Sequence, residues 1–329
     1  MTDLHKDQNI MAGFPTASQS MRFFCRLGME KVAWSLRRLH CPVDSDALVL
    51  EVGAGGNPYP RANVLLDGYE ESVERIESSL VIDRPLVLGF AEKLPFKTKS
   101  FDFIIASHVL EHSTDPESFL RELMRVGKAG YIETPDAFFE RINPFTYHRL
   151  EVAQIGSLIR LFKKPSWRHD GFIVDEYERQ LKDNQFIKFV SKHPYPFYMR
   201  LFWEDRICFE IVNPEVDSTW ALPIESYAQT AAMPKPTLRL RLRYFVRRVL
   251  RWLFSQNRRN RHIDLSSLLQ CPTCGADSLQ KDTDRFTCRT CQAIYPIRNG
   301  IPVMYPHLDS NYNGPNRKDY VNDRNSQNH

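Results

Sequence analysis

Four cysteines in the C-terminal part of the chain have the spacing of a metal site. They form two Cys-x-x-Cys pairs with 13 residues between the pairs, namely Cys271, Cys274, Cys288 and Cys291. This pattern is typical of a tetrahedral zinc site in which four thiolates take every coordination position. Because no position stays open for water, we expect structural zinc in a small ribbon. The alternative, two redox pairs, lacks the βαβ context of redox motifs.

A second group of residues that could bind a ligand lies at positions 48–56, which read Leu-Val-Leu-Glu-Val-Gly-Ala-Gly-Gly. This pattern predicts a buried strand that runs into a glycine-rich turn, where the backbone can approach a ligand closely. The carboxylate of Glu51 can neutralise an ammonium group, and Asp67 is placed to hold ribose hydroxyls. A dinucleotide motif requires glycine at position 58, where this chain has Pro58, so NAD is disfavoured.

The elements around these residues predict a doubly wound α/β sheet. Short apolar runs typical of buried parallel strands alternate with helix signals, and they predict strands at 47–52, 63–66, 85–90, 101–107 and from 131 onward. Asp115-Pro116 supplies an N-cap and an N1 proline for a helix before the last of these strands. We also expect a packing helix over 16–39 and a late strand over 207–212. Ligands of such sheets bind at the carboxyl ends of the strands.

Three segments together resemble the class I S-adenosylmethionine-dependent methyltransferases, in particular the ubiquinone and menaquinone methylases (methyltransferase type 11). They are residues 50–56, 91–96 and 100–112, and the resemblance covers roughly 47–135. It implies a Rossmann-like doubly wound sheet, S-adenosyl-L-methionine as cofactor and a methyltransferase activity. By this resemblance, the methionine part would contact Glu51, Gly53 and Gly55, the ribose Asp67, the adenine Ala91 and Glu92, and the methyl group His108.

Two departures from the family pattern concern the cofactor pocket. Phe90 stands where the family usually has an acid, so recognition of the adenine amine would fall to Glu92 or to the backbone. Only ten residues separate Gly56 from Asp67, too few for the usual helix plus strand. These departures keep a non-catalytic scaffold protein open as an alternative to an enzyme.

Methyl transfer is an in-line displacement, so alignment of acceptor and methyl group can supply much of the rate without a dedicated base. A hydroxyl acceptor would benefit from a histidine near neutral pH. We consider His108, His112, His148 and His169, and we predict His108, His148 and His169 as the catalytic candidates. Each has the alternative of a purely structural role.

Residues 269–304 resemble the small zinc-ribbon activator proteins that bind and stabilise methyltransferases of RNA and protein. The resemblance implies a partner that is covalently attached to its catalytic domain. Within this segment, Asn299-Gly300 between two short apolar runs predicts a hairpin turn.

Residues 237–262 carry nine arginines and no acid, which leaves the rest of the chain with a net charge of −5. Apolar residues recur at helical spacing between these arginines, for example Leu242, Phe245 and Leu253. Such a helix can lie on an anionic membrane surface, contact RNA phosphates, or link the domains with its apolar stripe packed on the protein.

The predicted organisation has an N-terminal helical segment (1–45), a methyltransferase domain (46–230) with a substrate-facing insertion (136–206), a basic helix (231–265), a zinc ribbon (266–306) and a disordered tail (307–329). We find neither a membrane-spanning apolar run nor a signal-peptide core, so we expect a cytoplasmic protein, peripheral at the membrane if the basic helix binds lipid. The expected acceptor is a small molecule, a glycan or a lipid-linked intermediate, with RNA as the alternative.

Overall fold

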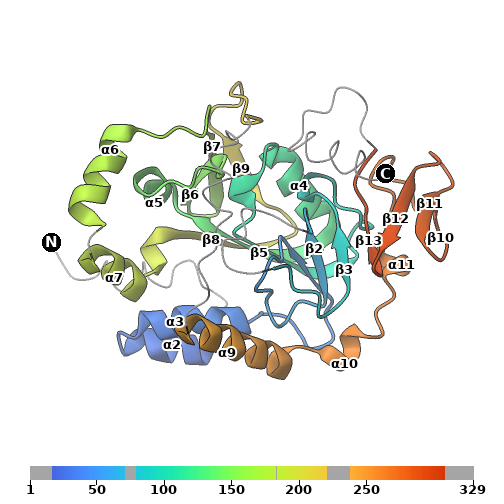
Figure 1. Cartoon of the computed structure of the whole chain (residues 1–329), viewed down its shortest axis with the longest axis horizontal. Coiled ribbons are helices and arrows are strands. Elements are labelled where there is room, and N and C mark those ends of the chain that lie inside the picture. The colour runs from blue at the N-terminus through green and yellow to red at the C-terminus, as the bar shows by residue number, and fades with distance from the viewer. Residues whose placement is uncertain (1–16, 71–78, 183, 221–237, 308–329) are drawn as a thin grey trace.

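The computed structural model describes residues 17–70, 79–182, 184–220 and 238–307 (Figure 1). The first 16 residues of the expected N-terminal helical segment, and all of the expected disordered tail except residue 307, lie outside the described residues.

A six-stranded sheet forms the centre of the molecule, with strand order β3-β2-β1-β4-β5-β8. Neighbouring strands run parallel except for β8, which pairs antiparallel with β5. Every residue of β1 and β2 is buried, as expected for parallel strands covered on both faces. The α/β class is confirmed, and the five predicted strands form as β1 (Val49–Val52), β2 (Val64–Asp67), β3 (Leu86–Leu88), β4 (Phe101–Ser107) and β5 (Gly127–Pro135). The sixth strand, β8 (Tyr198–Glu204), was not predicted.

Helix α4 (Pro116–Val126) begins where the sequence predicted it. The side chain of Asp115 caps it by accepting a hydrogen bond of 3.1 Å from the backbone N–H of Ser118. The prediction of one helix over 16–39 is wrong, because the structure has α2 (Gln19–Arg26), α3 (Glu30–Leu36) and the short turn η2 (Arg37–Leu39). Gly28, with a φ of +69°, takes the left-handed conformation that separates α2 from α3.

The connection from β1 to β2 contains no helix, as the short spacing predicted; residues 53–63 are all described and form a loop. Residues 255–260, which follow α9 (Leu238–Phe254) and include α10 (Asn257–Asn260), contact the end of this loop and the Arg84 side chain beside it. Asn63 donates a side-chain hydrogen bond of 2.8 Å to Asn260. The fully buried guanidinium of Arg84 donates to three carbonyl oxygens of the loop and to Ser255.

A second, three-stranded sheet of order β6-β7-β9 lies beside the carboxyl-end side of β5. It consists of β6 (Leu150–Ile155), β7 (Leu158–Lys163) and β9 (Cys208–Ile211). The late strand expected at 207–212 therefore forms in this sheet, whereas β8, which falls within 136–206, belongs to the central sheet. The remaining elements of this part are α5 (Ala137–Ile142), α6 (Gly171–Glu176), η5 (Tyr177–Leu181), α7 (Asn184–Lys192) and η6 (Tyr195–Phe197).

The C-terminal ribbon extends the β3 edge of the central sheet (Figure 1). The backbone N–H of Met304 donates to the carbonyl of Leu88 at 2.7 Å, which covers an edge strand that would otherwise be open. The ribbon and the sheet share one apolar core, where Phe286 and Tyr295 join Phe96. Its elements are α11 (Leu265–Leu268), β10 (Leu279–Lys281), β11 (Arg285–Cys288), β12 (Ile294–Arg298) and β13 (Ile301–Pro302).

The hairpin turn predicted at Asn299-Gly300 is confirmed. These two residues join β12 to β13 with φ values of +51° and +81°. Positive φ at both central positions is the requirement of a type I′ turn, which asparagine and glycine satisfy with little strain.

Candidate functional site

A pocket of about 310 Å³ lies at the carboxyl ends of β1, β2 and β4. Its position agrees with the rule that ligands of open α/β sheets bind beyond the strand ends. The lining includes every residue that the sequence predicted for the cofactor, namely Glu51, Gly53, Gly55, Asp67, Ala91, Glu92 and His108. The fold thus brings these residues together around one cavity.

The glycine-rich turn forms one wall of the pocket, and its shape depends on glycine. Gly53 has a φ of +71°, and a Cβ atom at this position would lie 2.7 Å from the Val109 side chain. Gly55 has a φ of +55° and donates its N–H to Oδ2 of Asp67 at 2.8 Å. Asp67, the residue predicted to bind the ribose, is therefore hydrogen-bonded to the turn in the ligand-free protein.

Glu51 is almost completely buried at the bottom of this wall, with 3% of its surface exposed. Burial raises the pKa of its carboxyl to about 7, although Arg38 and a hydrogen bond from the Tyr59 N–H act in the opposite direction. The Oε2 atom accepts that bond at 2.7 Å. A buried carboxylate of raised pKa is suited to bind a cationic group such as an ammonium, which would stabilise its charged form.

Aromatic residues lie where the family usually has an acid, on the side of the pocket that the sequence predicts for adenine. Phe90 packs against Tyr305 of the ribbon with 4.9 Å between ring centroids, and the Tyr305 hydroxyl donates to the carbonyl of Gly68 at 2.8 Å. Glu92 accepts a hydrogen bond of 2.6 Å from Ser113, and burial raises the pKa of its carboxyl. A ribbon residue thus supports this side of the pocket, which the sequence spacing gave no means to foresee.

His108 follows β4 and lines a part of the pocket, here called the His108 end, where it lies between two acidic side chains. Its Nδ1 lies 3.4 Å from Glu111 and its Nε2 lies 3.3 Å from Glu133. Burial lowers the pKa of this imidazole, but the two carboxylates outweigh burial and raise the pKa to about 9. At neutral pH His108 therefore keeps its proton and acts as a donor.

Glu133 is held in turn by Arg37, which forms a two-pronged ion pair with both carboxylate oxygens at 2.7 Å. The side chain of Glu133 is fully buried and that of Arg37 is 9% exposed. Burial alone would raise the pKa of Glu133, but Arg37 and His108 hold it well below its usual range. An ordered charge network therefore supports the His108 end of the pocket.

The other predicted histidines occupy different surroundings. His148 is 5% exposed and forms a 2.7 Å hydrogen bond between its Nδ1 and Glu140; burial, followed by the charge of His112, holds its pKa well below the usual range. His112 lines the pocket, with its ring 4.8 Å from the His148 ring. His169 is exposed just before α6 and does not line the pocket.

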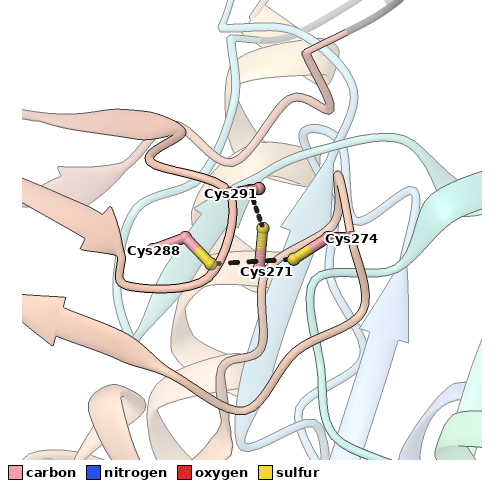
Figure 2. Close-up of side chains that lie close together, drawn as sticks. All are labelled: Cys271, Cys274, Cys288 and Cys291. Atoms are coloured by element: carbon pink, nitrogen blue, oxygen red, sulfur yellow. Dashed lines mark hydrogen bonds between the residues drawn. The ribbon is translucent and has the colours of Figure 1, made fainter.

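The four cysteines of the two Cys-x-x-Cys pairs converge at one point of the ribbon (Figure 2). The sulfur atoms of Cys271 and Cys291 are 3.6 Å apart, and those of Cys274 and Cys288 are 3.7 Å apart. A tetrahedral zinc–thiolate site with bonds of about 2.3 Å has edges of about 3.8 Å, so this arrangement fits zinc. A disulfide requires about 2.05 Å between sulfur atoms, so the separations do not fit oxidised pairs.

The arginine-rich helix α9 buries its apolar stripe only in part on the rest of the described protein. The side chains of Leu242, Phe245, Trp252 and Leu253 are 58–71% exposed. Val249 and Leu250 of the predicted stripe are half-buried, whereas Leu242, Phe245 and Leu253 are exposed, so the stripe packs only in part on the described protein. Within the described ranges, no helix combines the length and the apolar character needed to cross a membrane.

Comparison with known proteins finds similarity over two stretches of the chain. A family model described as a methyltransferase domain matches residues 50–132. A UPF0434 protein of Nitrosococcus oceani is 42% identical over 41 residues, which cover 12% of this chain and 70% of that protein.

Solved structures with similar parts include YcgJ of Bacillus subtilis (24% identity, TM-score 0.25). The similarity covers 32% of this chain and only half the length of YcgJ. A complex of the Haloferax volcanii Trm112 methyltransferase activator with a putative methyltransferase is also similar (18% identity, TM-score 0.26, 40% of this chain and 76% of that chain). A Thermotoga maritima S-adenosylmethionine-dependent methyltransferase is 22% identical (TM-score 0.26, 39% of this chain and 61% of that chain).

The family match spans the glycine-rich turn and strands β1 to β5, and the UPF0434 similarity agrees with the four-cysteine ribbon. The chain therefore carries a methyltransferase domain over residues 50–132 and a zinc ribbon related to UPF0434 proteins.

Proposed function

We propose that the chain transfers the methyl group of S-adenosylmethionine to a small-molecule, glycan or lipid-linked acceptor. The observation that carries this proposal is the single pocket lined by all seven residues predicted for the cofactor. S-adenosylmethionine supplies an electrophilic methyl group on a sulfonium. The residues of this chain bind it, orient it and exclude water, and such alignment accounts for much of the rate of an in-line displacement.

The roles follow from the chemistry of the wall residues. Glu51 binds the ammonium group of the methionine part, and the turn at Gly53 and Gly55 lets the backbone approach it. Asp67, which the Gly55 N–H already orients, accepts hydrogen bonds from the ribose hydroxyls. Phe90 packs on the adenine, while Ala91 and Glu92 contact its polar edge. The methyl group and the acceptor then lie at the His108 end.

Calorimetric titration of the zinc-loaded full chain with S-adenosylmethionine tests this proposal. We expect saturable binding, weakened about 10- to 100-fold in Asp67→Ala, since a charge-assisted hydrogen bond contributes about 1.5–3 kcal/mol. The matched control is Asp277→Ala, which removes an exposed carboxylate from the ribbon. If folded wild-type protein does not bind S-adenosylmethionine, the proposal is wrong and the scaffold alternative is favoured.

Helix α9 favours the lipid-linked branch of this proposal and a peripheral position at an anionic membrane. Exposed leucine, phenylalanine and tryptophan side chains among arginines are the composition of interfacial helices, whose apolar residues enter the acyl boundary while arginines contact head groups. Exposed leucines neither pair with RNA phosphates nor stack on bases, so they favour the membrane over RNA.

Flotation of the full chain with vesicles containing phosphatidylserine tests the membrane contact. We expect co-flotation that is lost when Leu242, Phe245 and Trp252 are all replaced by serine, because apolar burial supplies much of the affinity. Leu181→Ser and Phe172→Ser, two exposed apolar positions outside α9, are the control. Unchanged flotation of the triple variant would contradict the membrane contact, and RNA binding lost on removing the arginines would favour the RNA alternative.

A further inference from the structure

A cluster of metal-ligating side chains lies beside the His108 end of the pocket, and none of its members has been given to the cofactor. Glu111 and His112 come from the short turn η4 (Leu110–His112), and His148 comes from the loop before β6. We propose that these three residues bind a divalent transition-metal cation, and that this cation binds and activates a hydroxyl group of the methyl acceptor. The second half of this inference rests on the proposed methyltransferase function.

The first support is the geometry and type of the ligand atoms. One atom from each of the three side chains lies within 4.8 Å of the others. Three ligands of one cation at about 2.2 Å are about 3.1–3.6 Å apart, so binding requires the most distant pair to approach by about 1–2 Å, which side-chain rotation can supply. Two imidazoles and one carboxylate form the ligand set of many first-row metal sites that keep open coordination positions.

The second support is the hydrogen bond that orients His148. Its Nδ1 is 2.7 Å from Oε2 of Glu140, which leaves Nε2 as the nitrogen available for a cation. The other carboxylate oxygen of Glu140 accepts a 2.9 Å bond from Lys164, so this partner is itself fixed. Histidines that bind metals commonly donate their second nitrogen to a carboxylate in this way, which sets the tautomer and the ring orientation.

The third support is the state of Glu111. Glu111 is 1% exposed, and neither of its carboxylate oxygens accepts a hydrogen bond from the described part of the chain. Its ion-pair contact is His108, at 3.4 Å. Buried carboxylates normally have hydrogen-bond donors or cations around them, because an uncompensated buried charge is costly. The protonated His108 supplies part of this compensation but is shared with Glu133, and a cation beside His112 and His148 would supply the rest.

The position of the cluster determines what the cation would do. His112 lines the same pocket as Glu51 and Asp67, so the cation would lie at the acceptor end of the cofactor site. With three protein ligands, open positions remain for an acceptor oxygen, whose hydroxyl becomes more acidic when bound. The hydroxyl proton leaves to solvent water. The oxygen lone pair then forms the new O–C bond while the C–S bond breaks, and its electron pair stays on sulfur as a neutral thioether.

Mn²⁺ is the probe that separates this site from the ribbon, because thiolate sites favour softer metals than the nitrogen and oxygen ligands that suit manganese. The full chain, with its ribbon loaded with zinc, is titrated with MnCl₂, and free Mn²⁺ is followed by electron paramagnetic resonance. We expect about one bound Mn²⁺ per chain in the wild type. We expect at least about tenfold weaker binding in Glu111→Gln, and about 10- to 100-fold weaker binding in Glu140→Gln, which removes the orienting partner.

Glu117→Gln is the matched control, since it neutralises a half-exposed glutamate on α4 outside the cluster. Thermal unfolding of each variant verifies folding, and Glu140→Gln tests the inference if Glu111→Gln does not fold. No Mn²⁺ binding by folded wild type, or equal binding by wild type, Glu111→Gln and Glu140→Gln, would overturn the inference. Calorimetry with S-adenosylmethionine on the same samples is the separate readout: intact cofactor binding without metal binding overturns the metal site alone.

Discussion

The cysteine cluster of the ribbon and the Glu111–His112–His148 cluster of the pocket differ in how the chain builds them. The four cysteines lie within one small segment, and their regular spacing predicts tetrahedral zinc without knowledge of the fold. The pocket cluster combines one turn with a loop 36 residues later, and it is oriented by Glu140 of α5. Local spacing is thus sufficient to identify a structural metal site, whereas a site next to a substrate pocket depends on tertiary arrangement.

Removal of zinc should have the largest effect. We expect chelation or Cys288→Ser to lower the free energy of unfolding by more than about 5 kcal/mol, since structural zinc in small domains contributes about 10–16 kcal/mol of apparent binding energy. The ribbon shares its core with the sheet, so the loss should also weaken S-adenosylmethionine binding. Guanidinium denaturation and calorimetry measure the two effects.

Cys208→Ser is the control for this change, because Cys208 is exposed on β9 and belongs to neither pair. It should leave both quantities unchanged. If zinc removal unfolds the ribbon and leaves cofactor affinity intact, the two regions are independent, and the role given to Tyr305 beside Phe90 is wrong.

The next effect concerns the charge network that supports the pocket. Arg37→Ala leaves the buried Glu133 without its main cation, and we expect a loss of about 3–5 kcal/mol in the free energy of unfolding. Arg141→Ala breaks a pair whose arginine is 55% exposed, so it should cost no more than about 1 kcal/mol. Equal effects of the two variants in thermal unfolding would show that the pocket is not held by buried charge.

The pH dependence of Glu51 gives the smallest effect. Binding of an ammonium requires the ionised carboxylate, whose pKa is raised to about 7, so affinity for S-adenosylmethionine should rise up to about tenfold from pH 6 to 7.5. Glu51→Gln should remove this rise, as calorimetry at each pH would reveal.

The stability of the ligand-free protein should change in the opposite direction. A carboxyl whose folded pKa is raised binds more protons in the folded state, so this contribution to stability falls as pH rises from about 4.5 through about 7. Thermal unfolding of wild type and Glu51→Gln separates this trend from the titration of other groups. Parallel trends in affinity and stability would contradict the role of Glu51.

Periodicity and capping were sufficient to predict the parallel strands and α4, because apolar runs and Asp115-Pro116 act locally. The broken helix at Gly28 was missed because the apolar spacing continues across it. The convergence of the proposed cofactor residues on one pocket could be predicted, because these residues follow strand ends that meet at one edge of the sheet. The aromatic support of Phe90 by Tyr305 could not be predicted, since 215 residues separate them and no local pattern records the contact.

The helix-free connection from β1 to β2 has a consequence for how the protein folds. Asn63 forms side-chain hydrogen bonds with Gln256 and Asn260, which lie 193 and 197 residues later in the chain. Contacts of such high sequence separation slow folding, and a partly synthesised chain cannot make them. During synthesis the N-terminal half therefore lacks the contacts that support the β1–β2 loop, and its β3 edge stays exposed. A chain truncated before residue 255 should aggregate rather than form a smaller active enzyme.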